Sequence, residues 1–178
     1  MLFIFYAKED CQLNIQLLST QYDVRRILDY DITSVLHLCE SNPQYYDYCP
    51  PVVSVKEIKS DLTALPPEKT YEDKYYVGFF CGNQLMAVMD LIFKYPNEET
   101  AFIGFFMVNS KLQGCGVGSN IITECLQFLK RLGYAKVRLG YVKGNPQAKA
   151  FWEKNQFKPA GVESIQEHYT VVVMEKVL

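Results

Sequence analysis

The stretch QGCGVGS, residues 113–119, most constrains the fold of this chain, because three of its seven residues are glycines. An apolar run, Ala101–Val108, precedes it, and a segment with apolar residues at helical spacing, Val117–Leu132, follows it. This order predicts a buried strand, a tight turn and an amphipathic helix. Such a turn presents unpaired backbone N–H groups at the positive end of a helix dipole, which suits a phosphate group. A tight turn with no ligand would need the same glycines.

Two familiar phosphate-binding loops do not fit these residues. A Walker loop needs Gly-Lys-Ser/Thr, and the segment GVGSN has no lysine. A dinucleotide fingerprint needs Gly-x-Gly-x-x-Gly in a parallel βαβ unit, whereas Gly114, Gly116 and Gly118 alternate and follow antiparallel hairpins. The loop therefore belongs to another kind of site.

The rest of the chain reads as one α/β domain over residues 1–178, with no linker or repeat and with residues 1–20 left poorly defined. Gly82-Asn83 between two β-rich runs predicts a hairpin, and Ser54 with Glu57 forms a capping box. Further strands are expected at 22–28, 75–81, 85–93, 137–141 and 168–176, further helices at 31–39, 54–62 and 146–154, and a loop at 41–51.

Composition narrows the class of protein. A net charge of −2 argues against a nucleic-acid partner, because neutralising phosphates takes clustered Lys and Arg. No run approaches the roughly 20 apolar residues of a membrane span, so we expect no membrane partner. The six cysteines form no CxxC pair and have no metal-ligand spacing with His37 or His168, which predicts no metal site. Reduced thiols of this kind are typical of a cytoplasmic protein.

Read from Gln113, the loop is Gln-x-x-Gly-x-Gly, and here the sequence resembles the GNAT superfamily of acyl-CoA-dependent N-acetyltransferases. Two stretches carry the resemblance, FMVNSKLQGCGVGSNII and GYAKVRLGYVKGNPQAKAFWEKNQF. It covers Phe102 to about Phe157 and the terminal strand. It implies a mixed, largely antiparallel central sheet of six or seven strands flanked by helices. It also implies a splay between two central parallel strands, Ala101–Val108 and Val137–Val142.

The resemblance also implies an activity. The chain would transfer an acetyl group from acetyl-CoA, its co-substrate, to a primary amine by direct transfer in a ternary complex. The acceptor would be a small-molecule or peptide amine, and we expect a monomer or a homodimer. A GNAT-like module that binds acyl-CoA or a partner with little catalysis is the alternative.

Cofactor-binding residues follow from the same resemblance. The loop would bind the CoA pyrophosphate, the end of the preceding strand would pair with the pantetheine amides, and Asn145 and Phe151 would contact the cofactor arm. Asn145 is equally suited to helix capping, and Phe151 to the core. Lys143, Lys149 and Lys154 are candidates for the 3′-phosphate, or solvated surface charges. The loop residues are Gln113, Gly114, Cys115, Gly116, Val117, Gly118 and Ser119, and the strand residues are Met107 and Val108.

Two residues depart from the family pattern. Cys115 stands where a basic residue is common, so pyrophosphate binding would rely more on backbone amides. Trp152 stands where a tyrosine commonly protonates the leaving thiolate, and an indole N–H cannot serve as that acid. Water or Tyr141 are the candidate replacements. This departure is the feature that favours the alternative function with little catalysis.

The catalytic base and the acceptor site are predicted from residue type alone. Asp90 is the candidate base, because an acid within the apolar strand AVMDLIF must face solvent, pair with a partner or line a cavity. A structural role is the favoured alternative for Asp90. Glu98 and Glu99 are weaker candidates because turns carry solvated acids. Tyr45, Tyr46 and Tyr48 offer an aromatic wall for an amine, or a cover for the core.

Overall fold

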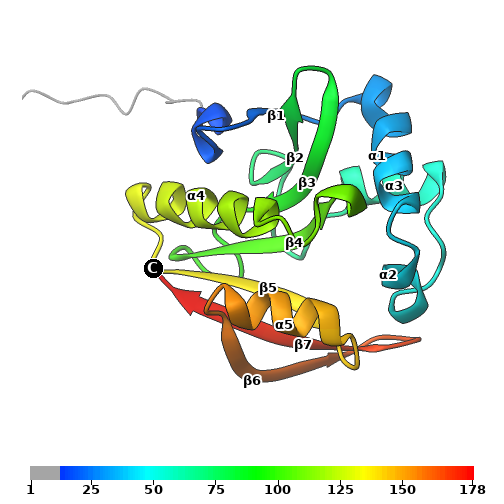
Figure 1. Cartoon of the computed structure of the whole chain (residues 1–178). Helices are drawn as coiled ribbons and strands as arrows, with labels where there is room; N and C mark the ends of the chain where they lie inside the picture. Colours follow the sequence, from blue (N-terminus) through cyan, green and yellow to red (C-terminus); the bar gives the residue numbers. More distant parts are fainter. Residues whose placement is uncertain (1–12) are drawn as a thin grey trace, which may run out of the picture.

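The computed structural model describes residues 13–178. Their fold is a seven-stranded sheet in the order β1-β2-β3-β4-β5-β7-β6, in which only β4 and β5 run parallel (Figure 1). The predicted mixed, largely antiparallel sheet is therefore confirmed. The strands are β1 (Asp23–Arg26), β2 (Lys74–Cys81), β3 (Gln84–Ile92), β4 (Thr100–Val108), β5 (Lys136–Val142), β6 (Lys158–Ile165) and β7 (Thr170–Val177).

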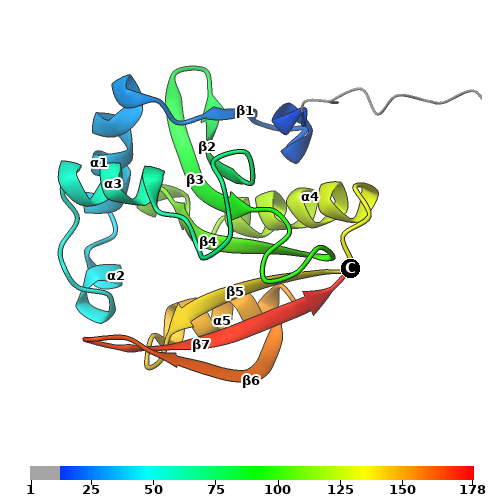
Figure 2. The same cartoon turned by 180° about the vertical axis from the view of Figure 1, so that it is seen from behind.

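Helices flank both faces of this sheet. Helices α4 and α5 lie on one face, and α1, α2 and α3 lie at the β3–β4 side of the other, as the view from behind shows (Figure 2). The α-helices are α1 (Ile32–Glu40), α2 (Pro43–Tyr48), α3 (Val55–Thr63), α4 (Val117–Arg131) and α5 (Pro146–Lys154), and the 3-10 helices are η1 (Ile15–Leu18), η2 (Asp29–Asp31) and η3 (Ser110–Leu112).

Local signals in the sequence start and stop these elements as predicted. Gly82, with φ +57°, makes the β2–β3 turn. The Ser54 hydroxyl accepts the Glu57 N–H at the start of α3, and the Asn145 side chain accepts the Ala148 N–H at the start of α5. Gly133, with φ +89°, follows α4. Each signal acts within a few residues, so the sequence alone reveals it.

One expectation was wrong, and one strand was not foreseen. Residues 41–51 were predicted to be a loop, but Pro43–Tyr48 forms α2, with Pro43 in its first turn, where a missing N–H costs nothing. The seven strands include β6, which no pattern in the sequence indicated. Its sequence KPAGVESI lacks alternation, and its pairing with β7 is interrupted between Pro159 and Glu163. Partnership with β7, not strand propensity, places β6 in the sheet.

The core lies in two layers that hold the sheet between them. One cluster lies under α4 and α5 and includes Phe79, Ile121, Leu139 and Met174, all almost fully buried. The second lies under α1 and α3 around Val35 and Val88. Before β1, the Ser19 hydroxyl donates to the Glu124 carboxylate on α4 at 2.5 Å, which fixes the start of the described chain. The five described cysteines are free thiols, and Cys11 lies outside the described residues. Among residues 13–178, no helix is long and apolar enough to cross a membrane.

The splay between the central strands decides where a site can form. Strands β4 and β5 pair from Thr100–Lys136 to Ile103–Leu139 and then separate, although both continue. From Gly104 to Val108, one edge of β4 therefore has no strand partner. The predicted splay is confirmed, and it opens the sheet directly before the glycine loop.

Candidate active site

A cavity of about 750 Å³ occupies the opening between β4 and β5. Its lining comes from β4, the glycine loop, the start of α4, α5, β5, α2 and the turn before β7. Nine predicted cofactor-binding residues line it, and two loop residues, Cys115 and Val117, do not. The nine are Met107, Val108, Gln113, Gly114, Gly116, Gly118, Ser119, Asn145 and Phe151.

The glycine loop brings bare backbone to this cavity. Gly114 and Gly116 have φ +75° and +85°, and the space around their Cβ positions is open to at least 4 Å. Gly116 precedes α4 and has no side chain to cap it, so the first N–H groups of α4 have no side-chain partner there. Gly118 differs, because a Cβ there would lie 3.1 Å from the Phe151 ring and 3.3 Å from Val108. The loop therefore combines an anion-binding helix start with close packing of α4 on β4 and α5.

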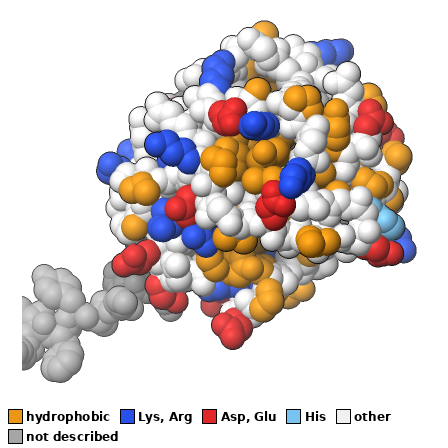
Figure 3. Space-filling model, turned by 90° about the horizontal axis from the view of Figure 1, so that it is seen from below, with side chains coloured by type: hydrophobic (Ala, Val, Ile, Leu, Met, Phe, Trp, Pro, Cys, Tyr) orange, Lys and Arg blue, Asp and Glu red, His pale blue; other side chains and the backbone are white. Residues whose placement is uncertain are grey.

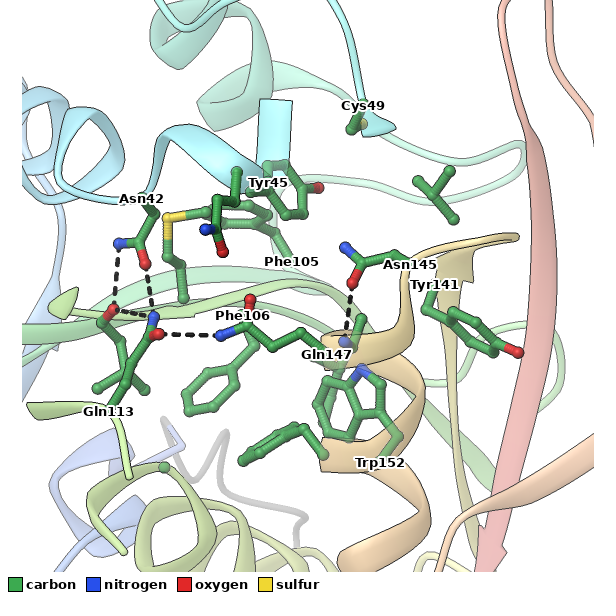
Figure 4. A pocket seen from close by; sticks show the side chains of 18 of the residues that line it. Asn42, Tyr45, Cys49, Phe105, Phe106, Gln113, Tyr141, Asn145, Gln147 and Trp152 are labelled. Atoms are coloured by element: carbon green, nitrogen blue, oxygen red, sulfur yellow. Dashed lines mark hydrogen bonds between the residues drawn. The ribbon is translucent and has the colours of Figure 1, made fainter. Parts of the chain in front are cut away.

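Three side-chain amides form a hydrogen-bonded chain across one end of the cavity (Figure 4). The Asn42 amide donates to the Val108 carbonyl at 3.2 Å, and its oxygen accepts from Gln113 Nε2 at 2.5 Å. Gln147 Nε2 donates to Gln113 Oε1 at 3.0 Å. The chain joins the α1–α2 connection, the glycine loop and α5. Asn42 and Gln147 were not predicted, because only the fold brings them to Gln113.

Replacing Asn42 by alanine is expected to weaken both the fold and cofactor binding. The Leu38 and Val108 carbonyls lose their Asn42 donor, which should cost about 1–3 kcal/mol of unfolding free energy. Gln113 also loses one of its hydrogen-bond partners, so the CoA dissociation constant should rise. Denaturant titration and calorimetry measure the two effects.

Asn155→Ala provides the control for this prediction. Asn155 is also buried and donates to the Phe151 carbonyl at 2.8 Å, but it does not line the cavity. The Asn155→Ala protein should be less stable than wild type and should bind CoA with unchanged affinity. Unchanged CoA affinity in Asn42→Ala would contradict a role for Asn42 at the cofactor site.

The far end of the cavity is aromatic. Tyr45 on α2 packs edge-on against Phe105 on β4 with ring centroids 5.8 Å apart, and Cys49 and Tyr169 lie at the same end. Burial raises the pKa of Tyr169 to about 12 and that of Tyr45 well above its usual value, so both phenols are neutral at physiological pH. Of the three predicted tyrosines, Tyr45 lines the cavity, whereas Tyr46 packs against the core and Tyr48 does not line it.

Asp90 lies behind this cavity rather than in its lining. Its Oδ2 atom is 2.6 Å from the Lys74 Nζ atom, and its Oδ1 atom is buried with no hydrogen-bond partner among the described residues. Burial raises the pKa of Asp90 above its usual value, and the Lys74 ammonium opposes that rise. Of the three options for an acid in this strand, Asp90 thus pairs with a partner. Its role as the catalytic base stays a prediction. Glu98 and Glu99 are exposed and do not line the cavity.

Comparison with known families identifies the chain. Residues 37–157 match the family model described as the acetyltransferase (GNAT) family, which is more than half of the chain. The chain belongs to the acetyltransferase (GNAT) family. It is accordingly an acyltransferase, with acetyl-CoA as its co-substrate. A comparison with curated protein sequences gave no match.

Solved structures share the GNAT fold with this chain. An acetyltransferase from Thermus thermophilus is 18% identical, with a TM-score of 0.72 over 89% of this chain and 97% of that one. The PaiA N-acetyltransferase from Thermoplasma acidophilum, solved in complex with coenzyme A, is 18% identical, with a TM-score of 0.63 over 87% and 98%. The ribosomal-protein-S18-alanine N-acetyltransferase from Escherichia coli is 14% identical, with a TM-score of 0.62 over 86% and 92%. At these identities the likeness establishes the fold.

Trp152, one of the two residues that depart from the pattern in the resemblance, is packed into the core beside the cavity. Trp152 on α5 is 7% exposed, and its ring contacts Phe151 and Phe157 with centroids 4.9 and 5.3 Å apart. It also lines the cavity, as does Tyr141 on β5. In the close view, the Tyr141 hydroxyl points away from Asn145 and the amide chain (Figure 4).

Proposed function

We propose that this chain transfers an acetyl group from acetyl-CoA to a primary amine of a small molecule or a peptide, directly in a ternary complex. One observation carries the proposal. A single cavity has a helix start with bare amides at one end and a wall of uncharged side chains at the other. Two ligands can therefore meet where β4 and β5 separate, which is the proximity that direct transfer needs.

The cofactor would lie along the first of these ends. The amides of residues 113–119 would hold the pyrophosphate. The edge of β4 that has no strand partner, at Met107 and Val108, would pair with the pantetheine amides, although the Val108 carbonyl already accepts from Asn42. The Asn145 oxygen accepts the Ala148 N–H at 2.9 Å, and its amide nitrogen would donate to the cofactor. Phe151 would pack along the cofactor arm.

The three lysines that are candidates for the 3′-phosphate contact differ in their surroundings. Lys143 pairs with Glu163 at 2.9 Å and Lys149 approaches Glu153 at 3.8 Å, and neither lines the cavity. Lys154 lines the cavity. We therefore assign the 3′-phosphate contact to Lys154.

The reaction requires a neutral amine. An alkylammonium with a pKa near 10.4 is only about one part in two to three thousand neutral at pH 7, so a base should take its proton. We propose Asp90 as that base, acting through a water. The amine nitrogen would then attack the thioester carbonyl, and the C–N bond would form. As the C–S bond breaks, the nitrogen would lose its second proton to water, and the thiolate would take a proton from water or Tyr141.

Turnover with a panel of amines tests the proposal. Release of free CoA should be measured with acetyl-CoA and a set of alkylamines, arylalkylamines and short peptides, together with product mass. We expect an acetylated product with at least one amine and release of CoA that depends on the amine concentration. CoA binding by calorimetry without turnover of any amine would contradict the proposal.

That contrary result would favour the second candidate function, a GNAT-like module that binds acyl-CoA with little catalysis. The observation behind it is Trp152, whose indole N–H lies at the cavity and cannot deliver a proton. The two candidates predict the same CoA binding and differ in turnover. The cytoplasmic location and the monomeric or homodimeric state stay predictions.

A further inference from the structure

We propose that Lys74 is a positioning residue for the acetyl transfer: it keeps Asp90 ionised and holds its carboxylate against Gly104, where β4 leaves β5. The inference rests on the proposed function and extends it to a residue with no place in the sequence pattern. In the sequence, Lys74 follows Glu72-Asp73 at the start of a strand and reads as an ordinary solvated lysine.

The Lys74 side chain is an unusual feature of the protein interior. It is only 4% exposed, although lysine is among the residues least often buried. Its Nζ atom reaches across from β2 to the Asp90 Oδ2 atom on β3, at 2.6 Å. Burying two charges costs free energy that an apolar pair of the same size would not cost. The pair therefore needs an explanation other than stability.

Gly104 connects this pair to the cavity. It lines the cavity and is the first residue of β4 beyond Ile103, the last residue that pairs with β5. A Cβ atom at Gly104 would lie 2.8 Å from Asp90 Oδ2, so the carboxylate fills the space that a side chain would take. The register shift between β3 and β4 falls directly after Asp90. The Asp90 carboxylate thus lies directly against Gly104, at the opening of the splay.

The second carboxylate oxygen is free to accept a proton. Asp90 Oδ1 is buried and has no hydrogen-bond partner among the described residues, a state that costs free energy unless a donor arrives. Because Oδ1 has almost no accessible surface, a water would have to enter beside it when the acceptor amine binds, and this water would supply the donor. The amine would pass one proton through this water to Oδ1, which turns the carboxylate into a carboxyl group. That proton leaves to solvent after the C–S bond breaks. The nitrogen loses its second proton to water as the amide forms, and the thiolate takes a proton from water or from Tyr141, which solvent then reprotonates.

Among the charged and titratable groups that face Asp90, Lys74 is the one that favours the ionised carboxylate. Tyr76 on β2 lies opposite Asp90, and burial keeps the pKa of its phenol well above the usual value, so it stays neutral. Asp61 on α3 is an acid, and its pKa is raised by burial and by Asp90. Lys74 is the cation that opposes the burial of Asp90. Without its charge, the carboxyl group would keep its proton to higher pH and would not act as base there.

The pH profile of kcat at saturating acetyl-CoA tests this role, because kcat reports ionisations in the bound complex. Lys74→Met should move the acidic limb of the profile to higher pH by on the order of one to three pH units. Lys74→Arg keeps the charge and should hold the limb near its wild-type position. An acidic limb that stays at the wild-type pH in folded Lys74→Met, or one that moves equally in Lys74→Arg, would overturn the proposal.

If Lys74→Met does not fold, a second measurement on the wild type and Lys74→Arg tests the proposal. Carboxyl carbon NMR titration of Asp90, assigned with Asp90→Asn, should give the same midpoint as the acidic limb in wild type and in Lys74→Arg. Midpoints that do not coincide would overturn the role of the pair. Wild-type protein that turns over no amine would instead overturn acetyl transfer itself, and with it this inference.

Discussion

Gly116→Glu is expected to remove CoA binding while the protein stays folded. A carboxylate at this position would project from the helix start into the open space of the cavity, where the pyrophosphate is proposed to lie. Like charges placed face to face cost several kcal/mol, so the CoA affinity should fall by on the order of 10²-fold or more. Calorimetry with CoA measures the loss, and circular dichroism reports the fold.

Gly133→Glu separates this charge effect from backbone strain. Gly133 has φ +89°, close to the φ of +85° at Gly116, and its Cβ position is equally open. It follows the other end of α4 and does not line the cavity. The two variants should lose similar stability, because both force a side chain into a left-handed conformation. Equal CoA affinity in folded Gly116→Glu and Gly133→Glu would contradict phosphate binding at the loop.

Asp90→Asn is expected to lower the rate at neutral pH by on the order of 10²-fold or more, with acetyl-CoA affinity unchanged. The amide cannot take a proton from the amine, so only the small neutral fraction of the amine reacts. The loss should shrink as the pH rises, because more amine then arrives without its proton. A pH–rate profile with saturating acetyl-CoA makes the measurement.

Asp31→Asn is the matched control. Asp31 is another buried carboxylate in an ion pair, at 2.7 Å from Arg25, and it does not line the cavity. The Arg25 guanidinium holds the pKa of Asp31 below its usual value, so Asp31→Asn should lower stability and leave the pH–rate profile unchanged. If folded Asp90→Asn behaves in the same way, Asp90 is a structural acid and the base lies elsewhere.

The surface seen from below carries apolar side chains among charged ones (Figure 3). The exposed apolar residues of β6 and β7 include Val162 and Val177. On β7, Glu175 lies 2.9 Å from Arg138 and 3.8 Å from Lys136. Neither valine lines the cavity between β4 and β5, so the proposed chemistry does not depend on them.

The site was predictable where its chemistry is local. The glycine loop, the start of α4 and the Asn145 cap each depend on residues within one or two turns of the chain, and all lie where the sequence placed them. Asn42 and Gln147 were missed because each is an ordinary polar residue near a helix start. Their importance comes from Gln113, which is 71 and 34 residues away, respectively.

The sequence by itself determined the strand–loop–helix order, the two motifs that identify the family and the boundaries of most elements. These features follow from backbone conformation, side-chain periodicity and capping, all of which act over short distances along the chain. The tertiary structure decided that β6 is a strand, that Asp90 pairs with Lys74 behind Gly104, and that Tyr45 and Tyr169 meet at one cavity. Those outcomes depend on strand register and on contacts between distant segments, because only a folded sheet fixes which side chains face one another.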